Sequence, residues 1–98
     1  MDGQSVIETL RRHKYDLNRQ GVVHAAVFGS VARGDTHAGS DIDILIDIDP
    51  DTHLSVFDYV GLKEYIAGLF DGPVDVVSAQ GLKPYLRRVV QAEKIYAF

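Results

Sequence analysis

Isoleucines and aspartates alternate over residues 41–49, where the chain reads DIDILIDID. With a period of two, the isoleucines lie on one face of an extended strand and the aspartates on the other, with Leu45 interrupting the acidic face. Residues 22–28 (VVHAAVF) are almost entirely apolar, which predicts a strand buried on both faces. Residues 74–78 (VDVVS) have the composition of a third short strand. The pattern therefore predicts three strands.

Before and after these strands, apolar residues recur at the spacing of a helix. Ser5 and Glu8 stand as in a capping box and Gly21 can supply a left-handed stop, so a first helix is expected over residues 5–20. Ser55 and Asp58 predict the start of a second helix, whose expected apolar stripe is Val56, Val60, Tyr65, Ile66 and Leu69.

The end of the chain predicts one more helix. Pro84 suits its first turn, and it should run to about residue 91. Residues 95–98 (IYAF) are expected to be a short strand or an extended tail.

The order of these elements defines a fold class. A tight connection makes the first two strands antiparallel, whereas a helix between the second and third allows a parallel crossover. We therefore expect an α/β (α+β) fold, in which a small mixed β-sheet is flanked by helices. At 98 residues, without linker or repeat, the chain is expected to be a single domain over residues 1–98.

This topology brings the candidate catalytic and binding residues to one end of the sheet. The end of the first strand carries Gly29 and Ser30, the second strand begins with Asp41 and Asp43, and the third carries Asp75. Aspartates at i and i+2 lie roughly 6.5–7 Å apart on one face, and a neighbouring strand is about 5 Å away. We therefore expect a cluster of three carboxylates beside a Gly-Ser turn.

Three such carboxylates repel one another unless a cation neutralises them, and Mg²⁺ prefers carboxylate, water and phosphate oxygens. Two ions could clamp the attacking and leaving oxygens of an in-line displacement. Gly29 leaves room for a close approach, and the Ser30 hydroxyl with nearby backbone N–H groups can cradle a phosphate. These parts suit nucleotidyl transfer from a metal-bound nucleoside triphosphate.

The composition of the chain argues against several other classes of function. The net charge of −4 argues against a nucleic-acid partner, and the absence of cysteine excludes thiol chemistry. No apolar run approaches the about 18 residues that span a membrane, so no membrane partner is expected and the protein is expected to be cytoplasmic.

The segment GSVARGDTHAGSDIDILI, with VDVV downstream, resembles the signature of the DNA-polymerase-β-type nucleotidyltransferase superfamily. The ARGxxxxxSDID motif and the small size of the chain are most similar to those of the minimal nucleotidyltransferases, which are antitoxin partners of HEPN-domain toxins. The resemblance implies that Gly29 and Ser30 hold the triphosphate. It also implies that Asp41 and Asp43 bind both metals and that Asp75 is the third ligand and possible base.

By the same resemblance, the reaction would transfer AMP from ATP to a hydroxyl of a HEPN toxin, with tyrosine expected. The protein would act as a type VII-like antitoxin, with two Mg²⁺ ions or Mn²⁺ as cofactor and ATP as substrate. On this view Lys83, Arg87 and Arg88 of the basic last helix are one candidate contact surface for the partner, and a solvated face is the other interpretation.

Several alternatives stay open from the sequence. The fold could serve as a non-catalytic binding module that neutralises its partner by contact alone. Arg33 could contact triphosphate or balance neighbouring aspartates. Asp47 and Asp49 need no role beyond solubility, and Ser40 is read as a turn residue.

A calcium loop is a weaker alternative, because the spacing has no glycine at its sixth position and ends in aspartate. The acidic positions of that spacing are Asp47, Asp49, Asp51 and Asp58. The four histidines show no paired ligand spacing and are not expected to bind zinc.

Overall fold

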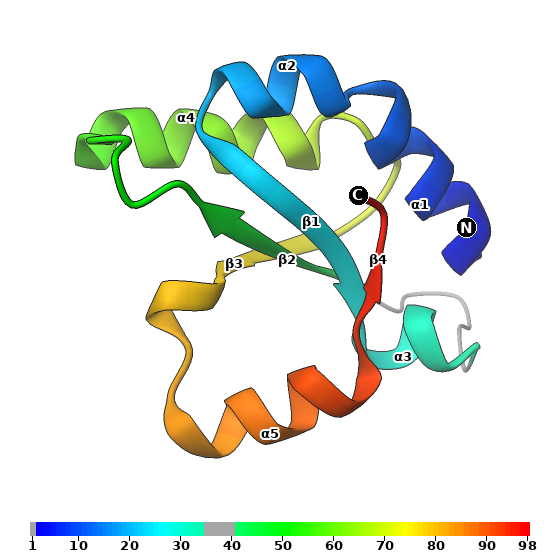
Figure 1. Ribbon diagram of the computed structural model, residues 1–98. Helices are drawn as coiled ribbons and strands as arrows, with labels where there is room; N and C mark the ends of the chain where they lie inside the picture. The colour runs from blue at the N-terminus through cyan, green and yellow to red at the C-terminus, as the bar shows by residue number, and fades with distance from the viewer. Residues whose placement is uncertain (1, 35–40) are drawn as a thin grey trace.

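The computed structural model describes residues 2–34 and 41–98, which form one four-stranded sheet with helices on both faces (Figure 1). The order across the sheet is β3-β2-β1-β4. β1 is antiparallel to β2 and β4, and β2 is parallel to β3. The predicted mixed α/β sheet is therefore confirmed, and the end of the chain adds a short strand. The bounds are β1 (Val22–Phe28), β2 (Ile42–Ile48), β3 (Val74–Ser78) and β4 (Ile95–Tyr96).

The helices divide between the two faces of this sheet. α1, α2 and α4 lie on one face and α5 lies on the other, while α3 follows the end of β1 (Figure 1). The larger buried cluster, with Ile44 and Ile46 at its centre, is on the first face, and a smaller one around Leu45 and Val90 is on the second. The bounds are α1 (Gly3–Arg12), α2 (Lys14–Arg19), α3 (Gly29–Arg33), α4 (Val56–Ala67), the 3₁₀ turn η1 (Ala79–Gly81) and α5 (Pro84–Glu93).

The single first helix predicted from Ser5 is wrong in two respects. The helix begins earlier, because the Asp2 carboxylate accepts a hydrogen bond from the Ser5 N–H at 2.8 Å and caps α1. This bond also lowers the pKa of Asp2. The helical run then breaks at His13, whose Nδ1 lies 2.8 Å from the Thr9 carbonyl oxygen while its own N–H donates to Leu10. A side chain that competes for a helical carbonyl favours such a break.

β1 is less buried than its composition predicts. Val23 and His24 are exposed, although Ala25, Ala26 and Val27 are buried as expected. The pairing with β2 shifts register between Val22 and His24. This irregularity, outside the stretch of β1 that pairs with β4, leaves both side chains in solvent.

The second predicted helix begins as expected, and the later part of its predicted stripe packs inward: Ile66 is buried, and Tyr65 and Leu69 are partly buried against the core. Ser55 Oγ accepts from the Asp58 N–H at 3.0 Å and Asp58 accepts from the Ser55 N–H at 3.2 Å, which confirms the capping box. Val56 and Val60 are nevertheless exposed, and Leu62 joins Ile66 as a buried residue. Residues four apart share a helix face, so Leu62 and Ile66 set the buried side.

Among the described residues no helix is long and apolar enough to cross a membrane; α4, the longest, has 12 residues.

Candidate active site

Strand pairing brings the candidate positions to one end of the sheet. Phe28, the residue before Gly29, lies opposite Asp43 in the antiparallel pair, and Asp43 lies opposite Asp75 in the parallel pair. Neighbouring strands are about 4.8 Å apart, so the three positions form a short row across the sheet. The order of the row is Gly-Ser turn, Asp43, Asp75, with β3 at the sheet edge.

Gly29 is required by its contact with Asp43. Its φ is +74°, in the left-handed region that side chains avoid, and a Cβ at this position would overlap the Asp43 carboxylate. The Asp43 side chain therefore packs directly against the backbone of the Gly-Ser turn. The sequence analysis explains this glycine by the close approach of a phosphate. The structure adds a second reason, which is the room that the Asp43 carboxylate needs.

Ser30 lies in the first turn of α3, which has Phe28 as its N-cap residue. Phenylalanine has no oxygen with which to cap the first N–H groups of the helix. Within the described residues, no side chain of the N-cap position therefore caps this turn, which directly follows the strand position opposite Asp43.

The electrostatics of the site centre on Asp43, which is half-buried while Asp41 and Asp75 are exposed. Burial raises the pKa of Asp43, and the negative charges of Asp75 and Asp41 raise it further; Arg33 opposes them. The charges of the other two carboxylates thus act on Asp43, and a raised pKa for one member of the group is what the sequence analysis expects.

Glu93 is a neighbour of the site that the sequence analysis did not assign. It also raises the pKa of Asp43, and its Oε1 lies 2.8 Å from Nη1 of Arg33. This ion pair joins α3 to the last turn of α5. The available signal was that Glu93 is the one carboxylate in the otherwise basic stretch of residues 83–94.

The sequence analysis expects Asp41, Asp43 and Asp75 to form a cluster of three carboxylates, and Asp41 and Asp75 lie close enough to raise the pKa of Asp43. Across residues 2–34 and 41–98, no three histidine, aspartate or glutamate side chains converge closely enough to hold a metal ion as they stand. Mutual repulsion favours this separation. The oxygen donors nevertheless suit Mg²⁺ in type, and the exposed side chains of Asp41 and Asp75 are free to turn toward Asp43.

The other acidic candidates have structural contacts of their own. Asp49 accepts a hydrogen bond from the Asp51 N–H at 2.9 Å, and Asp58 caps α4, so two positions of the calcium spacing stabilise a turn and a helix. Asp47 is half-buried further along β2. Ser40 and His37 lie outside the described residues.

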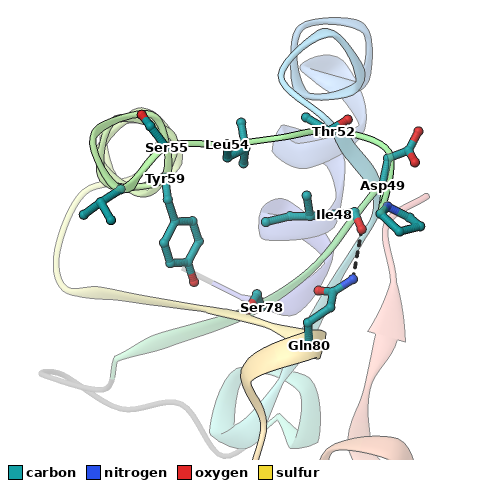
Figure 2. Close-up of a pocket in the computed structure, with 10 residues that line it drawn as sticks. Ile48, Asp49, Thr52, Leu54, Ser55, Tyr59, Ser78 and Gln80 are labelled. Carbon is teal, nitrogen blue, oxygen red and sulfur yellow. Dashed lines mark hydrogen bonds between the residues drawn. The ribbon is translucent and has the colours of Figure 1, made fainter.

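A separate cavity of about 380 Å³ lies at the opposite end of the sheet (Figure 2). It is bounded by the ends of β2 and β3 and the start of α4, and Gln80 Nε2 donates to the Ile48 carbonyl at 2.9 Å across one side. Asp43 precedes Ile48 by five residues of strand, which corresponds to roughly 16 Å. This cavity is therefore distinct from the Gly-Ser turn and the aspartates.

A Gly-Ser helical turn after one strand, with aspartates on the next two strands, is the arrangement of a nucleotide-transferring enzyme. The chain belongs to the nucleotidyltransferase domain family, whose model matches residues 8–97, and it is a nucleotidyltransferase.

The relatives agree with this assignment. The protein adenylyltransferase MntA of Thermococcus cleftensis is 34% identical over 94 residues, 95% of this chain and 93% of that protein. A solved structure described as a minimal nucleotidyltransferase has 36% identity and a TM-score of 0.78, covering 97% of this chain and 95% of the other. The fold is also similar to that in a complex of a tri-AMPylated HEPN toxin with its MNT antitoxin from Shewanella oneidensis. That match has a TM-score of 0.64 and 18% identity, over 94% of this chain and 71% of the other.

Proposed function

We propose that this protein transfers AMP from ATP to a hydroxyl of a partner HEPN toxin, with tyrosine as the expected acceptor, and so acts as a type VII-like antitoxin. The proposal extends to one catalytic domain over residues 1–98, acting in the cytoplasm. It is supported by the similarity to a protein named as an adenylyltransferase and by the shared fold with an antitoxin bound to an AMPylated toxin.

The observation that carries the proposal is the contact of the Asp43 carboxylate with the Gly29 backbone, beside Asp75. This contact supports the proposal, in which Asp43 would lie between a turn that holds phosphate and a second carboxylate, Asp75, that receives a proton. A transferase for nucleotides needs these groups in this order, because the leaving group and the attacking group lie on opposite sides of the reacting phosphorus.

Asp41, Asp43 and Asp75 would hold Mg²⁺, with two ions expected and Mn²⁺ as the substitute. When bound, the metal neutralises negative charge on the phosphates and lowers the pKa of the attacking hydroxyl. Backbone N–H groups at Gly29 and Ser30, with the Ser30 hydroxyl, bind the oxygens of the two outer phosphates. Arg33 adds positive charge on the same side.

On the other side, Asp75 accepts the proton of the acceptor hydroxyl as its oxygen attacks the α-phosphorus. A new oxygen–phosphorus bond joins AMP to the acceptor, and the bond to the β-phosphate oxygen breaks. Pyrophosphate then leaves from the Gly29–Ser30 turn.

The test is to mix the protein, ATP and Mg²⁺ with the HEPN partner and to measure added AMP by intact mass. Asp43→Asn should abolish transfer, because it removes a charged ligand. Asp47→Asn is the matched control, a half-buried aspartate further along the same strand face, and it should keep nearly full activity. Neutralisation of the toxin without any mass increase, unchanged in Asp43→Asn, would show a contact-only antitoxin instead.

A further inference from the structure

A cavity of about 320 Å³ opens beside Asp75 at the free edge of the sheet. β3 forms its floor, α4 contributes one wall through Tyr59 and Lys63, and the start of α5 contributes the other through Lys83, Tyr85 and Leu86. Because β3 is an edge strand, its outer backbone N–H and carbonyl groups face away from β2, toward this space.

The position of the cavity identifies which reactant it can hold. In the row across the sheet, the Gly-Ser turn lies on one side of Asp43 and Asp75 lies on the other. In-line displacement puts the leaving group and the attacking group at opposite ends of this row. With pyrophosphate at the Gly29–Ser30 turn, the attacking hydroxyl must arrive from the Asp75 side, where the cavity opens.

We infer that this cavity docks an extended segment of the acceptor protein, with acidic residues beside the hydroxyl that receives AMP. The inference rests on the proposed function and names the recognition elements of its acceptor: Lys63, Lys83 and the outer edge of β3.

The charge of the cavity favours acidic side chains in the docked segment. The charged residues among its described lining are Lys63, Lys83 and Asp75, and Asp75 would be engaged with the hydroxyl. Lys63 is half-buried, with Nζ 5.5 Å from the centre of the Tyr59 ring, whereas Lys83 is exposed. One lysine therefore stands on each wall of the cavity. Carboxylates that flank the acceptor hydroxyl would meet a lysine on either side.

The exposed edge of β3 along this cavity suits an extended peptide. Adding a strand to an exposed sheet edge provides main-chain hydrogen bonds, and side-chain pockets beside the edge provide selectivity. Tyr85, which is 67% exposed, and the partly exposed Leu86 offer apolar surface next to β3. These groups can hold the peptide while its hydroxyl reaches Asp75.

The experiment uses two short peptides, each with one tyrosine, flanked by glutamates in one and by lysines in the other. With the intact protein, ATP and Mg²⁺, we expect kcat/KM for AMP transfer to be about tenfold higher for the glutamate peptide. The double variant Lys63→Glu with Lys83→Glu should invert this preference while binding ATP as the wild type does. If the double variant fails to fold, Lys83→Glu alone, an exposed position, should reduce the preference several-fold.

The matched control is Lys14→Glu with Arg19→Glu, the same change of charge on α2, on the face of the sheet opposite α5. It should keep the wild-type preference. Equal use of both peptides by the wild type, labelling of the HEPN partner but of neither peptide, or a preference that the lysine variants leave unchanged would each overturn the inference alone. Absence of transfer to the partner by the wild type would instead overturn the proposed function.

Discussion

Replacing Gly29 with alanine tests the contact on which the site is built. The φ of +74° costs a residue with a Cβ about 1–2 kcal/mol, which for a chain of this length lowers Tm by roughly 5–15 °C. The added Cβ would also overlap the carboxylate of Asp43 and lie 3.2 Å from its Cγ, so the Asp43 side chain must move. Losses of ligand orientation of this kind reduce activity roughly 10- to 100-fold.

Gly34→Ala is the control that separates strain from overlap. Gly34 has a φ of +79°, almost the same strain, but no atom of residues 2–34 or 41–98 outside its own chain neighbours lies within 4 Å of where its Cβ would be. Thermal melting should therefore show both variants destabilised by the backbone change. AMP transfer, measured by intact mass at a temperature where both are folded, should fall in Gly29→Ala and persist in Gly34→Ala. Equal transfer rates in the two variants would refute the argument that the glycine makes room for Asp43.

Three further predictions concern the carboxylates and the helix cap. Asp75→Asn should lower AMP transfer more than it lowers ATP affinity by calorimetry, because its expected role is at the attacking hydroxyl; an equal loss of both would contradict that role. Burial, and then Asp75 and Asp41, raise the pKa of Asp43, so the folded chain binds this proton more tightly than the unfolded chain does. Without Mg²⁺, Asp43→Asn should therefore raise Tm at pH 7, and melts at lower pH should show this gain shrinking through the folded-state pKa; a gain that is constant with pH would exclude the carboxylate as its source. Ser55→Ala removes the side-chain cap of α4 and should lower stability by about 1 kcal/mol, seen as a Tm lower by roughly 4–8 °C with the transfer rate retained.

The sequence predicted the strands and their pairing because their signals are local. The alternation over residues 41–49 sets the faces of β2, and the lengths of the two connections decide antiparallel and parallel pairing. Once these are known, Gly29, Asp43 and Asp75 must lie at one end of the sheet. The placement of the candidate site therefore follows from short-range pattern and topology.

What the sequence predicted wrongly depends on competition and on tertiary contacts. Asp2 and Ser5 are both good N-cap residues, so the local sequence does not decide between them. In the structure Asp2 is the N-cap residue, and the first buried side chain of α1 is Val6. The inward face of α4 depends on Leu62 meeting the sheet, since the helix has apolar residues on several sides. Glu93 reaches Arg33 only because α5 crosses the sheet toward α3, and no local pattern encodes a contact across 60 positions.

The pairing of Asp43 with Asp75 makes the site depend on the most distant strand contact in its row. The Gly-Ser turn and Asp43 come together when β1 pairs with β2, whereas Asp75 reaches the site only when β3 pairs with β2, across the longer connection that contains α4. Contacts between distant segments carry the larger loop-closure cost and tend to form later. A folding intermediate in which only β1 and β2 are paired would contain the Gly-Ser turn and Asp43 but would lack Asp75, the proposed proton acceptor. Recovery of AMP transfer during refolding would therefore report the joining of β3 to β2, rather than the earlier pairing of β1 with β2.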